Sequence, residues 1–429
     1  MTLKKQSPLF LTVVNDSAGD KEEEDRISER SGKRVTDKWR EYRWGDLATL
    51  EYGKGLCGYK DSIGTYPVYG TNGLIGRHTE PLCPHSGVII GRKGAYRGVH
   101  YSEKPFFVID TAFYLEPKAD IDLKWAYYQL LTQNINNMDS GSAIPSTSRD
   151  AFYNLPVKVP SLPEQKTIAL ILGALDDKIE LNRQMNETLE AMARAIFKSW
   201  FVDFDPISGF GPHKEWQDSP LGKIPKGWKV ARVSDAFEIN PSRQIKKGIQ
   251  YAHVDMASLP TTSARVTKIT RREFTGSGSK FKNGDVLFAR ITPCLENGKT
   301  ALVDFLPENE YGWGSTEFIV FRPKEPLNPW FVYCVARNQE FRDHAIRAMS
   351  GTSGRQRVEI GCFNNFSGVM PPAEITAKFG DIVKPWFTQM KINDEQSHTL
   401  VGIRDALLPK LLLGEIRVKG TERFVEAAS

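Results

Sequence analysis

The sequence has few cysteines and no long apolar run, and each absence excludes a class of protein. Its five cysteines among 429 residues are odd in number, and no two form a Cys-x-x-Cys pair. This pattern argues against a disulfide framework and a zinc ribbon, and it fits a reducing cytoplasm. No run approaches about 18 apolar residues, so we expect no membrane span. The opening MTLKKQSPLFLTVV lacks a small-residue cleavage site, so we expect no signal peptide.

Catalytic and cofactor motifs are also missing. Asn297-Gly-Lys-Thr300 resembles the end of a phosphate-binding loop, but Pro293 stands where the loop needs a glycine whose N–H faces phosphate. Asn328-Pro-Trp-Phe331 resembles the Asn-Pro-Pro-aromatic motif of amino-methyltransferases, but it lacks the second proline and no Gly-rich cofactor turn precedes it. The seven histidines are scattered, so we expect no metal site. These absences favour a binding protein over an enzyme.

Composition and charge indicate a globular protein of several domains. At 429 residues, with 40% hydrophobic and 25% charged residues, the chain exceeds one ordinary core and predicts roughly two or three domains. The net charge is only +5, but residues 220–371 hold 22 Lys and Arg against 14 Asp and Glu, whereas residues 39–160 hold 13 against 12. Such a local surplus suits phosphate binding, although a solvated basic surface would look the same.

The chain contains an internal repeat, which we infer from four matches that occur in the same order in both copies. The offset between matched residues rises from 189 through 198 and 205 to 211, as small insertions in the second copy would produce. One match can arise by chance, but an ordered series of four indicates a duplicated unit. The matched segments are Trp39–Asp46 with Trp228–Asp235, Gly87–Arg92 with Asp285–Arg290, Trp125 and Tyr128 with Trp330 and Tyr333, and Phe152–Pro160 with Phe363–Pro371.

Each copy begins with a mixed α/β stretch. Short β-branched and aromatic segments bounded by Gly and Pro predict strands at residues 87–92 and 106–117, and again at residues 285–290 and 316–323. Helical periodicity predicts helices at residues 123–133 and 330–347. The sequence therefore predicts two tandem mixed α/β (α+β) domains.

A long helix is expected after each α/β stretch. Pro163 and Glu164 suit a first helical turn, and apolar residues then alternate at spacings of four and three, as in a coiled-coil seam. The run covers about 38 residues, roughly 57 Å. Pro385 and Pro409 should kink or shorten the second helix. The seam positions are Ile168, Leu172, Leu175, Ile179, Asn182, Asn186, Leu189, Ala193, Ile196 and Trp200, and then Phe379, Val383, Trp386, Met390, Asn393, Ser397, Leu400, Arg404, Leu407 and Leu411.

The two seams share polar residues at their centres, and a buried Asn is a known device for fixing register and partner. An amphipathic helix that packs on its own domain would explain each seam separately. The length of the helices and the matched polar positions favour pairing of the two helices. Because the connection 203–220 is rich in Gly and Pro, the chain can turn back, and we expect an antiparallel coiled coil.

Six short motifs carry a family resemblance. They are Tyr66–Gly76, Gly141–Arg149, Leu155–Pro160, Leu162–Gln165, Ile196–Phe204 and Leu221–Trp228. With the repeat, they resemble the specificity (S) subunits of Type I restriction-modification systems, from Trp39 to about Glu415. The departures are an extra N-terminal segment, the prolines of the second helix, and Met370-Pro-Pro-Ala-Glu374 in place of Val159-Pro-Ser-Leu-Pro-Glu164.

The resemblance implies a non-catalytic, cytoplasmic subunit that recognises double-stranded DNA. Two target-recognition domains would each read one part of a split site and leave the bases between unread. This chain would bind no cofactor. Modification subunits would dock on it and supply methyl transfer from S-adenosylmethionine, and a restriction subunit would supply ATP- and Mg-dependent translocation and cleavage.

The predicted organisation follows the repeat. It comprises a flexible extension (1–38), the first recognition domain (39–160), the first spacer helix (161–205), a linker (206–219), the second recognition domain (220–371), the second spacer helix (372–415) and a tail (416–429).

DNA contacts require cations and N–H groups for phosphates and forked donors for base edges. We favour the Gly-rich loops of each copy. The sharpest choice is Arg92 with Arg290, since both follow equivalent strands, although a strand-end arginine often only bridges to a neighbouring carboxylate. The candidates are Lys54, Lys60, Thr71, Asn72, Arg92, Lys93, Arg97, Ser146, Thr147 and Arg149 in the first copy, and Arg243, Lys246, Lys247, Arg271, Arg272, Lys280, Lys282, Arg290, Ser353, Arg355 and Arg357 in the second.

Two other functions fit the sequence less well. A self-contained DNA methyltransferase or nuclease is disfavoured by the missing cofactor loop. A coiled-coil scaffold that binds only protein is disfavoured by the aromatic-rich α/β stretches with basic loops.

Overall fold

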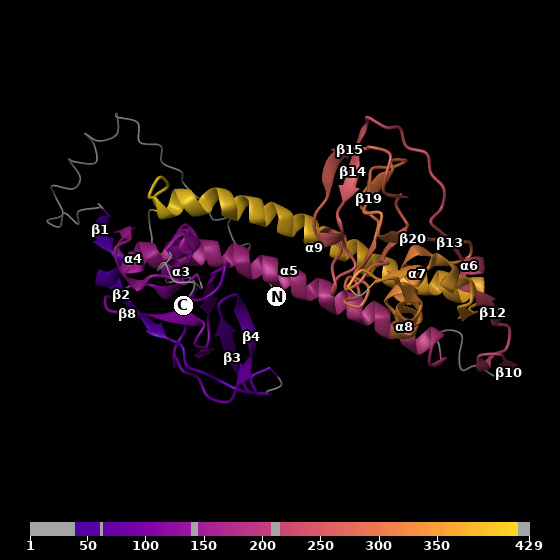
Figure 1. The fold of residues 1–429 in the computed structure, drawn as a ribbon, viewed down its shortest axis with the longest axis horizontal. Coiled ribbons are helices and arrows are strands. Elements are labelled where there is room, and N and C mark those ends of the chain that lie inside the picture. Colours follow the sequence, from indigo (N-terminus) through magenta and orange to yellow (C-terminus); the bar gives the residue numbers. More distant parts are fainter. Residues whose placement is uncertain (1–38, 61–62, 139–144, 207–214, 353, 419–429) are drawn as a thin grey trace, which may run out of the picture. The chain divides into compact units, whose positions relative to one another are not determined.

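The computed structural model describes residues 39–60, 63–138, 145–206, 215–352 and 354–418 (Figure 1). The chain divides into two compact units. The first unit comprises Met1–Ile179 and His398–Ser429, and the second comprises Glu180–Ser397. The predicted extension 1–38 lies outside the described residues, as do parts of the predicted linker and tail.

The described residues of the first unit form three small sheets, two of which are fully antiparallel. The four-stranded sheet has the order β2-β8-β5-β6, a three-stranded sheet has the order β4-β3-β7, and β1 pairs with β9. The three-stranded sheet is mixed because β3 runs parallel to β7. The strands are β1 (Arg40–Arg43), β2 (Ala48–Tyr52), β3 (Tyr66–Gly70), β4 (Gly73–His78), β5 (Gly87–Gly91), β6 (Val99–Ser102), β7 (Phe107–Val108), β8 (Ala112–Pro117) and β9 (Pro156–Val159).

The second unit contains the same kinds of sheet. Its four-stranded sheets have the orders β13-β20-β17-β18 and β15-β14-β19-β16, and β12 pairs with β23. Two further pairs are β10 with β11 and β21 with β22. The strands are β10 (Trp216–Ser219), β11 (Gly222–Pro225), β12 (Lys229–Arg232), β13 (Phe237–Ile239), β14 (Gln250–Val254), β15 (Thr270–Glu273), β16 (Ser279–Phe281), β17 (Val286–Ala289), β18 (Thr300–Leu302), β19 (Gly312–Gly314), β20 (Phe318–Pro323), β21 (Met349–Ser350), β22 (Arg357–Val358) and β23 (Ser367–Met370).

The sequence repeat appears in the strand pairing. In the first unit Ile90 of β5 lies opposite Phe113 of β8, and in the second unit Phe288 of β17 lies opposite Ile319 of β20. The parallel pair β3–β7 likewise corresponds to the parallel pair β14–β19. Each predicted strand segment contains an observed strand, and the predicted mixed α/β class is confirmed.

Short helices flank these sheets, and one of them differs from the prediction. Residues 330–347 were expected to form one helix, but they form α7 (Pro329–Arg337) and α8 (Gln339–Arg347). Asn338 separates them because its backbone is extended and its side chain accepts from the N–H groups of Glu340 and Phe341, which caps α8. The other short helices are α2 (Trp44–Leu47), α3 (Leu123–Leu131), α4 (Arg149–Tyr153), α6 (Val233–Ala236), and the 3₁₀ turns Ile135–Asn137, Met256–Ser258 and Ile360–Asn364.

Two long helices follow the α/β parts, α5 (Leu162–Phe201) and α9 (Ala373–Leu412), each of 40 residues. The prolines were expected to kink or shorten the second helix, and the equal lengths of α5 and α9 exclude the shortening. Pro385 is exposed, so water can reach the backbone carbonyl that loses its partner, and Pro409 stands in the last turn. All twenty predicted seam positions are buried or partly buried. Among the described helices, none has the length and apolarity that a membrane span needs.

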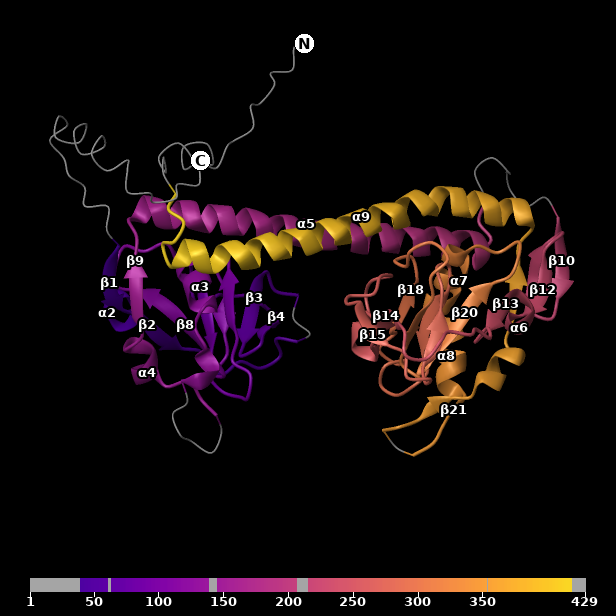
Figure 2. The same cartoon turned by 90° about the horizontal axis from the view of Figure 1, so that it is seen from above.

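Segments of α5 and α9 pair within each unit, and Figure 2 shows them side by side. In the second unit Asn186 Oδ1 accepts from Asn393 Nδ2 at 2.8 Å, and the Trp200 and Phe379 rings lie 6.3 Å apart. In the first unit Arg404 Nη1 donates to Asp176 Oδ1 at 2.8 Å. Trp200 comes after Asn186 in α5, whereas its partner Phe379 comes before Asn393 in α9. The paired segments of the second unit therefore run antiparallel.

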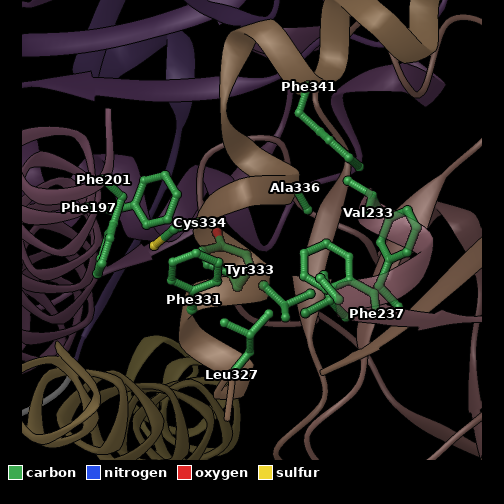
Figure 3. Close-up of a cluster of buried hydrophobic side chains, with 14 of the residues drawn as sticks. Phe197, Phe201, Val233, Phe237, Leu327, Phe331, Tyr333, Cys334, Ala336 and Phe341 are labelled. Atoms are coloured by element: carbon green, nitrogen blue, oxygen red, sulfur yellow. The ribbon is translucent and has the colours of Figure 1, made fainter. Parts of the chain in front are cut away.

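The long helices α5 and α9 contribute side chains to the hydrophobic core of each unit. Figure 3 shows Phe197 and Phe201 of α5 beside Phe331 of α7, with ring centroids 5.3 and 5.0 Å from it. In the first unit Trp44 and Trp125, both fully buried, lie with their rings 6.4 Å apart. Burying one such side chain contributes about 1.5–3 kcal/mol. In the second unit these contacts join the α/β part to α5, and in the first unit Ile168 and Leu172 of α5 belong to the same core cluster as the two tryptophans.

Equivalent tyrosines of the repeat each donate a hydrogen bond to a carboxylate of α5. Tyr128 Oη donates to Asp176 Oδ2 at 2.7 Å, and Tyr333 Oη donates to Glu190 Oε1 at the same distance. Burial raises the pKa of both phenols, so they remain donors at neutral pH. The repeat therefore preserves a tyrosine–carboxylate bond as well as the strand order.

Candidate nucleic-acid interface

The end of strand β5 gathers predicted arginines around an aromatic ring. Arg92 follows β5, and its guanidinium lies 4.7 Å from the ring centroid of Tyr52. Arg149, at the start of α4, lies 5.2 Å from the same ring. Tyr52 is 47% exposed, and among the described residues neither arginine forms an ion pair with a carboxylate. Because two cations held on one exposed ring repel each other, the arrangement favours a nearby anion or hydrogen-bond acceptor.

Four further predicted residues lie in or contact the segment that holds Arg92. Lys93 Nζ is 3.4 Å from a half-exposed Asp110 carboxylate, and Ser146 faces Lys93 in an isolated β-bridge. Thr71 donates to the Lys93 carbonyl at 2.9 Å, and the buried Thr147 donates to another backbone carbonyl at 2.8 Å. The two threonines therefore hold the loop that presents the cations.

The remaining predicted residues of the first unit divide into exposed and buried. Lys54, Lys60 and Asn72 are exposed. Arg97 is only 3% exposed, and its Nη2 donates to the Asn136 carbonyl at 2.6 Å. Arg97 therefore stabilises the loop from inside and offers no donor to the surface in this conformation.

In the second unit Arg290 and Arg357 share one carboxylate. Arg357 donates through Nε and Nη2 to Glu317 at 2.7–3.0 Å, and Arg290 Nε lies 4.0 Å from Glu317 Oε2. The Glu317 side chain is 21% exposed and that of Arg357 is 45% exposed. A bidentate pair fixes the plane of a guanidinium, so Arg357 is presented to solvent in one orientation.

Three predicted residues of the second unit surround a buried aspartate. Arg243 Nη2 lies 2.8 Å from Asp285 Oδ2, and both side chains are nearly inaccessible. The backbone N–H of Lys282 also donates to Asp285, and Lys280 Nζ donates to the Arg243 carbonyl at 2.9 Å. Breaking a buried ion pair costs about 3–5 kcal/mol, so Arg243 has a structural role.

The other predicted residues of this unit lie at its surface. Arg271 Nη1 is 3.7 Å from Glu310, and Arg272 pairs with Asp255 at 2.8 Å, with both arginine side chains about half exposed. Lys246, Lys247 and Arg355 are exposed, and Ser353 lies outside the described residues.

The structure also brings together Cys83, His85 and Glu116, a cluster that the sequence did not predict. His85 Nε2 lies 3.5 Å from Glu116, while Cys83 Sγ lies 3.5 and 3.6 Å from the two ring nitrogens of His85. A sulfur nearly equidistant from both nitrogens is off the line of either lone pair. A shared metal ion requires lone pairs that converge, so this conformation is not arranged as a metal centre.

Two contributors to the interface were missed by sequence reasoning. Tyr52 forms the platform for two arginines, and Glu317 orients Arg357. Both stand at strand ends, one closing β2 and the other just before β20. The candidates were restricted to cations and small polar residues, and including aromatic and acidic residues at strand ends would have found both.

Comparison with known proteins points to one family. Residues 36–191 match the family model described as the Type I restriction modification DNA specificity domain. The chain is 26% identical over 320 residues to the Type I restriction enzyme MjaIX specificity subunit of Methanocaldococcus jannaschii, covering 71% of each chain. It is 21% identical over 419 residues to the MjaVIII specificity subunit of the same organism, covering 92% of this chain and 97% of the other. It is 25% identical over 377 residues to the HindI specificity subunit of Haemophilus influenzae, covering 72% and 81%.

A solved structure shares the fold. The S subunit of a Type I restriction-modification system from M. genitalium aligns with a TM-score of 0.57 at 16% identity. The alignment covers 89% of this chain and 98% of that subunit. The mixed α/β parts and the long helices therefore occur together in a known fold.

Proposed function

The chain is a homologue of Type I restriction enzyme specificity subunits, and we propose that it is the DNA sequence-specificity subunit of a Type I restriction-modification complex. The observation that carries the proposal is the likeness over nearly the whole length of such subunits. The basic cluster at the end of β5 and the oriented arginine near β22 supply the donors that DNA recognition requires.

Each unit reads one half of a split DNA site, and the bases between the halves go unread. The duplication supports this assignment, because the two units repeat one strand order but present different side chains at corresponding strand ends. Cations such as Lys54 and Arg355 would contact phosphates, while forked donors such as Arg92 and Arg357 would reach base edges.

The helices α5 and α9 form an antiparallel coiled coil that sets the spacing between the half-sites. A central layer of polar residues supports a fixed register, since Asn186 bonds Asn393 at 2.8 Å and Asp394 at 2.7 Å. A shift of either helix by one heptad would bury these amides without partners, at about 1–3 kcal/mol each. A split site needs such a fixed spacing, because both half-sites must meet their readers at one angular phase of the duplex.

Partner subunits supply the chemistry. Modification subunits bring S-adenosylmethionine, and a restriction subunit brings ATP and Mg, while this cytoplasmic chain recognises DNA and docks them. Exposed apolar side chains on α5 support docking. Leu181, Met185 and Met192 are 49, 37 and 44% exposed and stand about one and two helical turns apart.

The test is selection from a random duplex library by the full-length chain, alone and with its modification subunit. We expect enrichment of one motif with two constant halves and a gap of fixed length. Enrichment of a single undivided motif would contradict the split-site assignment. Failure to retain duplex DNA, with the modification subunit still bound, would favour a scaffold that binds only protein. Methyl transfer by the lone chain would favour the self-contained methyltransferase.

A further inference from the structure

The loop behind Arg92 has a backbone framework made of three contacts. Arg92 N donates to the Thr111 carbonyl at 2.9 Å, and Thr147 N donates to the Arg92 carbonyl at 2.8 Å. Lys93 and Ser146 form an isolated antiparallel bridge beside them. Each of these three contacts joins main-chain atoms only, so none of them requires a particular side chain at Arg92, Thr111 or Ser146.

The same framework recurs in the second unit. Arg290 N donates to the Glu317 carbonyl at 3.0 Å, and Val358 N donates to the Arg290 carbonyl at 2.9 Å. Ile291 and Arg357 form the matching antiparallel bridge. Arg92 thus corresponds to Arg290, as the sequence repeat predicts from equivalent strands. The structure adds two correspondences that the sequence matches did not include, Thr111 with Glu317 and Ser146 with Arg357.

The corresponding positions differ in chemistry although their backbones agree. One position is arginine in both units, the second is threonine in one and glutamate in the other, and the third is serine in one and arginine in the other. All six residues are exposed or partly exposed. A fixed backbone that presents variable side chains at the surface is suited to reading different sequences with one scaffold.

We propose that these three positions determine base specificity in each unit, that is, Arg92, Thr111 and Ser146 in the first and Arg290, Glu317 and Arg357 in the second. This proposal rests on the proposed function and identifies the residues that contact the DNA bases. In the second unit Glu317 holds the guanidinium of Arg357 through Nε and Nη2, which leaves N–H groups on its other edge. Such an oriented fork reads guanine through O6 and N7, so Arg357 is the base reader and Glu317 its positioning residue.

The test exchanges residues between units within the full-length chain. The variant Glu317→Thr with Arg357→Ser gives the second unit the side chains of the first, and Thr111→Glu with Ser146→Arg does the reverse. Selection from a random duplex library in complex with the modification subunit reports both halves of the motif. We expect the first variant to lose a guanine in the second half only, with discrimination falling about tenfold or more. The reverse variant should alter the first half only.

A matched control changes the same residue types elsewhere in the second unit. Glu340→Thr with Arg347→Ser alters two exposed residues of α8 and leaves the net charge unchanged, as the exchange does. This control should leave both halves of the enriched DNA motif unchanged. Glu317→Gln gives a second route if the exchange variant fails to fold, because it keeps the shape of the side chain and weakens its hold on Arg357. That variant should relax guanine preference without reducing retention of total DNA.

The outcomes separate this inference from the proposed function. A wild-type complex that enriches no motif contradicts the proposed function. A wild-type complex that enriches a split motif, together with exchange and Glu317→Gln variants that enrich the same motif unchanged, overturns this inference alone. A change confined to the wrong half also overturns it.

Discussion

Replacing Tyr333 by phenylalanine removes one hydroxyl from the interior of the second unit. The ring is fully buried, and its hydroxyl donates to Glu190 Oε1 at 2.7 Å. Glu190 is 2% exposed, so water cannot take the place of the lost donor. Arg337 is a charged partner of Glu190, and its Nη2 lies 3.3 Å from the same oxygen.

The expected loss of stability follows from the charge and burial of the acceptor. A hydrogen bond to a charged group contributes about 1.5–3 kcal/mol. For a unit of this size each kcal/mol lowers the melting temperature by about 2–4 °C, so we expect a decrease of about 3–12 °C. Tyr128→Phe in the first unit provides the matched control. Its bond is equally short, but the Asp176 side chain is 29% exposed, and solvent limits that loss to about 1 kcal/mol or less.

The loss of stability in Tyr333→Phe should also depend on pH. Burial raises the pKa of Glu190, and the hydrogen bond from Tyr333 opposes that rise. Without the hydroxyl the pKa of Glu190 rises further, so the folded variant binds a proton more tightly than the wild type. Acidification therefore stabilises the variant relative to the wild type, and the difference in stability should shrink as the pH falls from 7 toward 5.

Hydrogen–deuterium exchange gives the local readout that a chain of two units requires. Peptides from α7 should exchange faster in Tyr333→Phe, and peptides from α3 should change less in Tyr128→Phe. Equal effects of the two substitutions, or a difference that does not vary with pH, would refute the reasoning from burial and charge.

Three further outcomes are expected. Arg271→Ala with Arg272→Ala should weaken binding to all DNA and reduce the salt slope by about 0.9 for each phosphate that is no longer neutralised, in binding titrations at several salt concentrations. A changed base preference at constant slope would make these arginines base readers. Arg92→Ala should weaken DNA binding at unchanged melting temperature, whereas Arg97→Ala should lower the melting temperature. Seven residues inserted after Asn186 should alter the unread gap with less loss of stability than four, because seven keep the heptad phase.

Local patterns in the sequence were sufficient to predict the fold class and most of the helices and strands named in advance. The buried seam of α5 follows from apolar residues spaced by three and four, and strand segments such as 87–92 follow from short runs of β-branched and apolar residues. Both patterns depend only on residues that are close in the sequence. The break at Asn338 was missed because α7 and α8 are both helical in pattern, and only the capping bonds of Asn338 divide them. The prolines do not shorten α9, since water can take the place of the hydrogen bond that the exposed Pro385 removes and Pro409 stands in the last turn.

The site was less accessible to sequence reasoning, because it depends on contacts between distant segments. Nothing near Arg92 in the sequence indicates that it lies on Tyr52 beside Arg149. Composition cannot separate the exposed Lys54 from the buried Arg97, since both lie in Gly-rich loops. The residue types were predicted, but their partners and burial required the fold.

The order of synthesis places a constraint on how this protein folds. The core of the first unit includes Leu411 and Leu412 from the end of α9, both almost fully buried against residues from the first half of the chain. A ribosome delivers the chain from the N-terminus, so the core of the first unit can close only after Leu411 and Leu412, which follow the whole second unit in the chain, have been made. The second unit, which is one continuous segment, can complete its core earlier, so the part made first is the last to be finished.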